Sequence, residues 1–255
     1  NIIAQKYKMQ SENPRILALT ASPGSDHGKI KQICKNLAIE EVELRTRESP
    51  DVAPYLQELE FTKIEVAFPP EFEEIRHLLQ KLFNQYVETL KKSKILWDYP
   101  SKINLINLQK KMMATISRGN KSFSYLIGMS ACAQAIKLQH ALELLETQTL
   151  HVFNKYLKDL FKQAQQKKSK GVIKLVAKPE FNFIYLQTNE LLTKNQEHPK
   201  LGKLIEIIKQ EQKENPNLKI IVFTQFRETA TIISKNLNEI PNIIAKTFVG
   251  QAKKD

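Results

Sequence analysis

Cysteine is scarce in this 255-residue sequence, which contains two, Cys34 and Cys132. They lie far apart, each in an apolar pattern with helical spacing, so we expect reduced residues in a core. This excludes a disulfide-stabilised secreted fold and suits a reducing compartment such as the cytosol. No cysteines and histidines have zinc-site spacing, so no metal site is expected. The histidines are scattered and are expected to be structural: His27, His77, His140, His151 and His198.

Long apolar runs are also missing. No stretch approaches the ~20 residues of a membrane-spanning helix, and no signal-peptide pattern is present. We therefore expect no membrane as a partner. The first residue is Asn1 rather than Met, so we expect the chain to be a piece of a longer protein.

A phosphate-binding loop is absent too, although residues 17–30 suggest one at first sight. The motif G-x-x-x-x-G-K-[ST] uses backbone amides to hold phosphates and a hydroxyl to bind Mg²⁺. Here the spacing from Gly24 to Gly28 is one residue short, and Ile30 occupies the hydroxyl position. The pair Gly202-Lys203 is followed by Leu204 and does no better. The stretch is better explained as a strand, a tight turn and a helix.

Acidic residues are outnumbered by 39 basic ones to 27, which gives a net charge of +12. Residues 1–69 have a net charge of −1, residues 70–195 of +10 and residues 196–255 of +3. A basic excess confined to one segment is typical of a surface that binds a polyanion. A lysine-rich helical surface exposed to water is the alternative, and charge alone does not separate the two.

Both ends of the sequence predict an α/β fold with parts of a sheet. Short apolar runs are expected as strands at residues 15–19, 41–45, 61–68, 219–224 and 243–249. Helices are expected between them, one capped by Ser25 or Asp26 and running through Leu37, the other spanning 227–237.

Helical spacing of apolar residues runs through the middle, from Pro70 to about residue 195. Four helices are expected to begin near Pro70, Ile103, Ser122 and Gln148, and residues 181–192 favour a fifth. The apolar side of the second is expected to be Ile103, Ile106, Met113 and Ile116. Small residues at 129–133 predict that another helix approaches closely there. The polar, basic stretch 165–174 is expected to be a loop or the end of a helix. This pattern predicts a helical bundle.

Trp97 and Tyr99 lie near the break Tyr99-Pro100-Ser101. We favour a role as anchors of a loop to the core over stacking on a nucleic-acid base.

Two stretches of the sequence, separated by the basic helical region, resemble motifs of a known protein family in their order and spacing. RILALTASPGS (15–25) and KIIVFTQFRETA (219–230) flank the basic helical region. With ELRTRESPDVAPY (43–55), KLQHALELLETQ (137–148), HPKLGKLIEIIK (198–209) and FVGQ (248–251), they resemble superfamily 2 helicases of the archaeal Hef and eukaryotic Fanconi anaemia M branch. The helical region also looks like that of RIG-I-like receptors.

The resemblance implies three parts. Residues 1–69 would be the C-terminal part of a first RecA-like motor domain, 70–197 a thumb-like helical insert, and 198–255 the N-terminal part of a second motor domain. Thr20, Ala21 and Ser22 match motif III, which relays the nucleotide state. Phe223, Thr224, Gln225 and Arg227 match motif IV, which holds a nucleic-acid phosphate. Gly250 and Gln251 match a further element near the DNA path.

The resemblance also implies an ATP-dependent DNA helicase as the parent, acting on forked or branched DNA in fork repair with ATP and Mg²⁺. The groups that phosphoryl transfer requires are missing here: Walker A, the Asp-Glu pair and the arginine finger. We therefore expect no catalytic residue, bound cofactor or ATP hydrolysis in this chain. The location would be cytoplasmic in an archaeon or nuclear in a eukaryote.

Within the family the insert recognises forked DNA, and the charge distribution indicates the same segment. The expected phosphate contacts are Lys110, Lys111, Arg118, Lys121, Lys158, Lys162, Lys167, Lys168, Lys170 and Lys174. About six contacts would give a log–log salt slope of roughly −5. A non-catalytic nucleic-acid-binding or protein-interaction module is the alternative function, and RNA is an alternative ligand.

Overall fold

The computed structural model describes residues 2–56, 60–119 and 122–250, and within these ranges every regular element is a helix. The predicted α/β fold is therefore wrong for this chain, because none of the five expected strands is paired into a sheet. The contacts divide the chain into residues 1–63 and residues 64–255. None of the described helices combines the length and apolar character needed to cross a membrane.

The first unit contains α1 (Ile2–Gln10), α2 (His27–Leu37) and the short 3-10 helix η1 (Ala53–Tyr55). Asp26 caps α2, since its Oδ1 accepts the amides of Gly28 (2.9 Å) and Lys29 (3.2 Å). The stretch 15–19 is extended rather than a buried strand, and Leu17 and Leu19 are exposed. Without a neighbouring strand, an apolar run has neither a hydrogen-bonding partner nor a surface to cover it.

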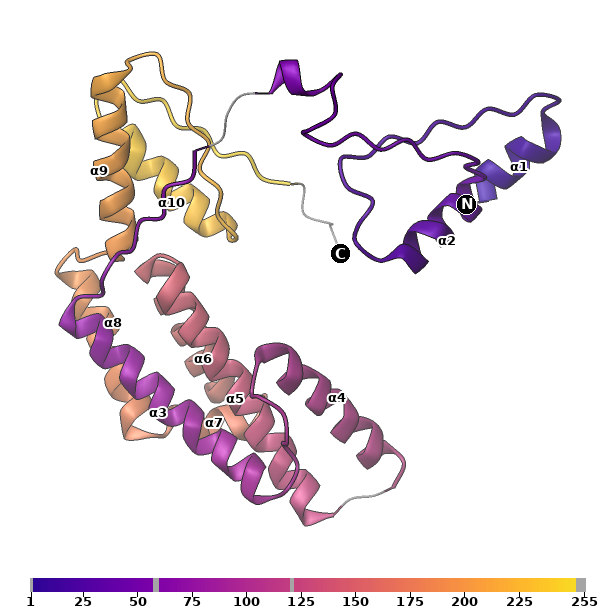
Figure 1. The fold of residues 1–255 in the computed structure, drawn as a ribbon. Coiled ribbons are helices and arrows are strands. Elements are labelled where there is room, and N and C mark those ends of the chain that lie inside the picture. The colour runs from indigo at the N-terminus through magenta and orange to yellow at the C-terminus, as the bar shows by residue number, and fades with distance from the viewer. Residues whose placement is uncertain (1, 57–59, 120–121, 251–255) are drawn as a thin grey trace. The chain divides into compact units, whose positions relative to one another are not determined.

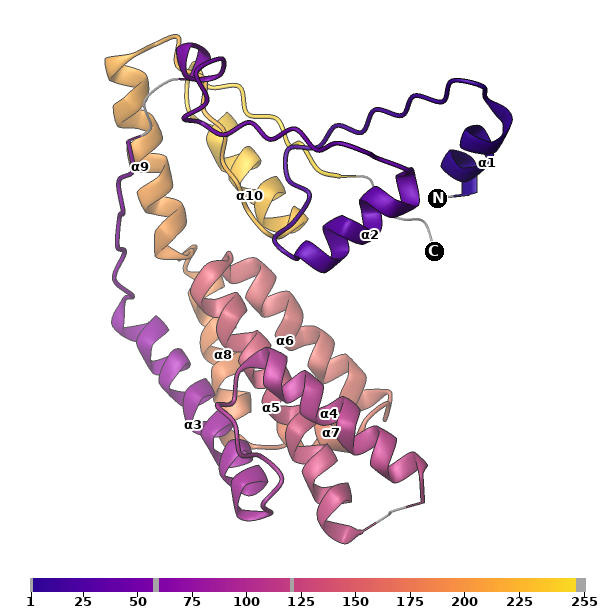
Figure 2. The same ribbon diagram turned by 45° about the vertical axis from the view of Figure 1, so that its right-hand side comes forward.

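The second unit contains the predicted helical bundle (Figure 1). It consists of α3 (Pro70–Lys92), α4 (Lys102–Ser117), α5 (Phe123–Thr147), α6 (Leu150–Gln165), α7 (Lys170–Val176) and α8 (Pro179–Thr193). Helix α5 is central: α3, α4, α6 and α7 all pack against it, as Figure 2 shows from a second direction. The core is made of leucines and phenylalanines such as Leu79, Leu138 and Phe153.

Local sequence signals set where these helices begin. Pro70 opens α3, with Glu71 and Glu73 in its first turn and Lys91 and Lys92 in its last, as the helix dipole favours. Ser101, Ser122 and Thr149 cap α4, α5 and α6 by accepting backbone amides. Residues 181–192 lie in α8, which confirms the preference for helix there. The basic stretch 165–174 is only partly a loop, because α7 starts at Lys170.

The close approach of a helix to the small residues of α5 is confirmed. Cys132 is buried, and its thiol donates to the Leu105 carbonyl of α4 (3.2 Å). Burial raises the pKa of this thiol to about 11. The predicted apolar side of α4 is wrong, however, since Ile103 and Met113 are exposed while Leu105 and Met112 are buried.

Gly128 on α5 allows the chain after α3 to pack closely. A Cβ there would lie 2.5 Å from Ile95 Cδ1 and 3.4 Å from Met112 Sδ. Changing Gly128 to Val is therefore expected to lower the free energy of unfolding by about 1–3 kcal/mol through overpacking. Chemical denaturation followed by circular dichroism measures this. Gly202 on α9 is the matched control, because nothing lies within 4 Å of a Cβ there. An equal loss in Gly202→Val would contradict the packing argument.

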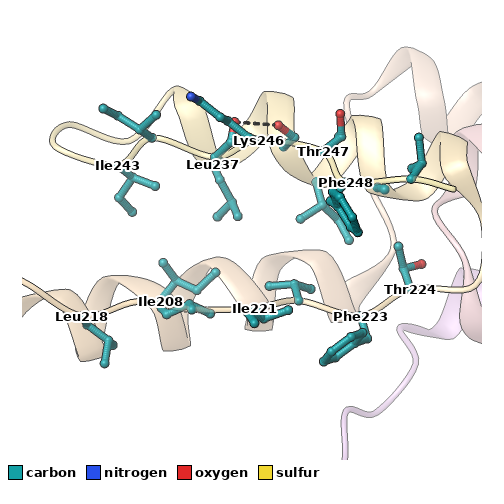
Figure 3. Close-up of a pocket in the computed structure, with 18 of the residues that line it drawn as sticks. Ile208, Leu218, Ile221, Phe223, Thr224, Leu237, Ile243, Lys246, Thr247 and Phe248 are labelled. Carbon is teal, nitrogen blue, oxygen red and sulfur yellow. Dashed lines mark hydrogen bonds between the residues drawn. The ribbon is translucent and has the colours of Figure 1, made fainter. Parts of the chain in front are cut away.

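Two extended segments follow the bundle, with α9 (Pro199–Glu214) and α10 (Arg227–Asn238). Residues 218–224 and 243–249 run side by side in Figure 3 and line a cavity of about 710 Å³ with both helices. No backbone hydrogen bond joins the two segments within the described residues. The Asn238 side chain instead satisfies both backbone groups of Ala245, at 2.9 Å each. The runs predicted as strands are thus extended but unpaired, which is why no sheet forms.

Candidate nucleic-acid interface

The basic residues expected on the second half of α6, the following turn and α7 are all exposed. They are Lys158, Lys162, Lys167, Lys168, Lys170 and Lys174, and we call them the α6–α7 lysines. Leu157 and Leu160 of α6 and Val172 and Leu175 of α7 point into the core. Helices α6 and α7 pack against each other, so these lysines lie on two neighbouring helices and on the turn between them.

A left-handed residue ends α6 within this group. Lys167 has φ 52°, and its amide donates to the Ala164 carbonyl (3.0 Å). The Lys168 amide donates to the Gln163 carbonyl (3.1 Å). This is the usual helix C-terminal motif, except that glycine is the preferred residue at the left-handed position. The turn presents two consecutive lysines to solvent.

A shallow groove of about 520 Å³ lies between α6 and α8. Lys155, Lys158 and Lys162 line it from α6, at helical spacing on one side, and Asn189 and Thr193 line it from α8. Cationic groups along a groove suit a phosphate backbone, which they hold as point charges.

Most of the α6–α7 lysines form no ion pair in the part of the chain that the structure describes, although Asp159 lines the same groove. Among the described residues, only Lys162 is in an ion pair, with Asp159 at 3.9 Å, and both side chains are largely exposed. Such a pair contributes little. Lys155 and Lys194 nearby are instead held by Glu228 and Glu190. The α6–α7 lysines are therefore the part of this surface whose charge is available to a ligand.

The second expected group lies at the end of α4. Lys110, Lys111 and Arg118 are exposed and form no ion pair within the described part of the chain. Lys121 lies outside the described residues. Helix α4 packs on α5, whereas the α6–α7 lysines lie on other helices of the bundle.

The residues matched to motif IV precede and begin α10. Phe223, Gln225 and Arg227 are exposed and Thr224 is half-buried. The Arg227 guanidinium donates to the Gly250 carbonyl, so the structure brings these two expected site residues together. Gln251 lies outside the described residues.

Sequence reasoning missed how α10 is fixed to the bundle. Buried Thr229 donates to Gln148 Oε1 (2.7 Å), Glu228 pairs with Lys155, and Phe226 lies 6.4 Å from the His140 ring. Phe226 also packs against the bundle core. A buried side-chain hydrogen bond is costly to break. The start of α10 and the bundle are therefore one packed unit.

His198 occupies a second joint, where Phe68, α3, α5 and α9 meet. Its side chain is 3% exposed, and its ring lies edge-on to Phe68 and Phe72. Its Nδ1 accepts the Lys200 amide (3.2 Å), so its Nε2 donates to the Leu145 carbonyl (3.0 Å). Burial, with the charge of Lys200, lowers its pKa to about 4. The histidine is thus neutral and structural, as expected.

The motif III residues lie in the first unit and are exposed. The Thr20 hydroxyl donates to the Ser22 carbonyl (3.1 Å) and accepts the Ser22 amide (3.2 Å), so it closes a local turn. Within the described ranges, no group of His, Cys, Asp and Glu is arranged to hold a metal ion.

Comparisons with known proteins define the class. Residues 71–191 match a family described as the helical bundle of an ATP-dependent RNA helicase. The crystal structure of the Pyrococcus furiosus Hef helicase domain superposes on this chain with a TM-score of 0.71 and a sequence identity of 35%. The match covers 99% of this chain and 53% of the Hef chain. The chain thus carries a helicase-type helical bundle between flanking helicase sequences.

Curated relatives narrow the class further. MJ1505 of Methanocaldococcus jannaschii, named as an ATP-dependent RNA helicase, is 34% identical over 99% of this chain. The Fanconi anemia group M protein homolog of Mus musculus is 30% identical over 93% of it. Along nearly its whole length, the chain is similar to helicases of the Hef and Fanconi anaemia M family. It spans 31% of MJ1505 and 13% of the mouse protein.

Proposed function

We propose that this chain is the central part of an ATP-dependent DNA helicase that acts on forked or branched DNA. The observation that carries the proposal is the group of exposed α6–α7 lysines, of which, among the described residues, only Lys162 is in an ion pair, on a bundle similar to that of this helicase family. In this proposal the bundle (70–197) binds the DNA backbone, and residues 1–69 and 198–255 belong to the two motor parts of the parent.

ATP and Mg²⁺ would be bound by other parts of the parent. Thr20, Ala21 and Ser22 would relay the nucleotide state between the motor parts. Thr224 and the amides at the start of α10 would hold a phosphate of the bound strand. The contact of Arg227 with the Gly250 carbonyl supports a shared role for these two positions.

Binding of the 255-residue chain to labelled forked, duplex and single-stranded DNA, over a salt series, tests the proposal. Forks are expected to bind most tightly, with a log–log salt slope of roughly −5 for about six phosphate contacts. The chain is expected to hydrolyse no ATP with any DNA present, since the required groups are absent from its sequence. Weak binding to all three DNAs with no preference would contradict the proposal.

The same series with forked and duplex RNA separates the two ligands that the relatives' names suggest. The names of MJ1505 and of the matched family contain the word RNA. Another relative, of Sclerotinia sclerotiorum, is named "ATP-dependent DNA helicase mph1". It is 27% identical over 98% of this chain, and this chain covers 22% of it. Tighter binding to RNA would move the proposal to an RNA helicase.

A further inference from the structure

The loop between α3 and α4 displays two aromatic rings to solvent. Trp97 and Tyr99 are each 81% exposed, so the expectation that they anchor the loop to the core is wrong. Trp97 is also the sole tryptophan of the sequence. Burying an aromatic ring of this size is normally a large source of stability, so two rings in water two residues apart require another explanation.

The loop that holds them is fixed on both sides. Leu96, directly before Trp97, is buried, and Ile95 packs against the same core. The Tyr99 carbonyl accepts the Ser101 amide (2.7 Å) and Asn104 Nδ2 (2.9 Å). The backbone that carries the two rings is therefore fixed without help from a ligand. Such preorganisation lowers the entropic cost of binding.

Lysines without an ion pair outnumber such acids in the sequence next to the rings. Lys91 and Lys102 are near Glu88 (3.8 Å) and Glu143. Lys92 and Lys94 have no ion pair among the described residues, and Asp98 is the opposing unpaired acid. The surrounding segment 70–195 has a net charge of +10. Aromatic faces beside lysines are the arrangement that binds single-stranded nucleic acid, in which unpaired bases stack on the rings.

We propose that Trp97 and Tyr99 form a stacking platform for unpaired bases of a nucleic-acid strand. The inference rests on the proposed function, because it gives the helicase bundle a contact to the single-stranded part of its substrate. Stacking on an aromatic ring tolerates any base, so the platform distinguishes unpaired from paired strands without reading sequence.

The fluorescence of Trp97 reports directly on this site, because no other tryptophan contributes. The chain is titrated with an oligothymidylate of about 20 nucleotides, a length that covers the usual single-strand site sizes, and with an abasic strand of the same length. Overall binding is followed by the anisotropy of a label on each strand. The oligothymidylate is expected to quench Trp97, and the abasic strand to bind through its phosphates without quenching.

Tyr99→Ala and Trp97→Ala are expected to weaken binding of the oligothymidylate about fivefold or more, whereas Trp97→Phe keeps most of it. Tyr55→Ala is the control, because Tyr55 is an exposed tyrosine of the first unit. Binding with unchanged Trp97 fluorescence and neutral alanine variants would overturn this inference alone and leave the rings as a contact for protein. A lack of binding to either strand while forked DNA is still bound would also overturn this inference alone. A lack of binding to forked, duplex and single-stranded DNA would overturn the proposed function as well.

Discussion

Changing Lys158, Lys162, Lys167 and Lys168 to Glu is expected to weaken binding of forked DNA by about 100-fold or more near 0.1 M salt. Each lysine that binds a phosphate contributes about 0.9 to the log–log salt slope. Such a lysine therefore raises the affinity for DNA nearly tenfold when the salt concentration is lowered from 1 M to 0.1 M. The expected effect therefore requires that only two of the four changed lysines bind a phosphate. The slope should fall by about 2 in the same titration.

A variant with the same change in net charge elsewhere separates a local contact from general repulsion. Lys31 and Lys35 on α2 and Lys209 and Lys213 on α9 are exposed lysines away from the α6–α7 lysines in the sequence. Changing these four to Glu is expected to cost far less affinity. Equal losses in the two variants would mean that the charge of the whole chain, rather than the α6–α7 surface, attracts DNA.

Acid is expected to destabilise the second unit through His198 before carboxylates are protonated. The folded-state pKa of His198 is about 4, below its ordinary value of 6.5. The unfolded chain therefore binds a proton more readily than the folded one between these two values. The contribution of His198 is complete above pH 6.5 and is lost as the pH falls to about 4. A shift of this size corresponds to about 3 kcal/mol.

Chemical denaturation of the chain at a series of pH values, followed by circular dichroism, measures this loss. His198→Gln is expected to be less stable at neutral pH and to lose most of the dependence between pH 6.5 and 4.5. His77→Gln keeps the dependence, because His77 is exposed on α3. The carboxylate of Glu143, whose pKa Lys102 lowers, affects stability only below its ordinary value of 4.5. An unchanged pH profile in His198→Gln would contradict the assignment.

The sequence predicted the bundle well because helices are locally encoded. A helix needs partners four residues away, and a stripe such as that of α3 is visible in the sequence itself. Strands failed for the opposite reason. Residues 219–224 have the composition of a buried strand and are extended, yet a strand exists only with a second segment hydrogen-bonded beside it. That partner is not a local property of the sequence.

The candidate site was predicted unevenly. Charge indicated the α6–α7 lysines, but only the fold showed that α8 makes a groove beside α6 and that Lys155 is already engaged by Glu228. The apolar periodicity predicted the wrong buried side of α4, because apolar residues lie on its exposed and buried sides alike. The exposure of Trp97 was not predicted, because an aromatic ring in a turn between two helices usually anchors that turn to the core.

Lys167 shows where this bundle gives up stability. A side chain in the left-handed region costs about 1–2 kcal/mol that glycine avoids, and the backbone there has φ 52°. The positive charge lies next to the carbonyl end of α6, which offsets part of that cost. A search for heat-resistant variants would be drawn to glycine at this position. The same change would remove a charge from the proposed DNA contact, so thermal resistance and affinity for DNA oppose each other at this residue.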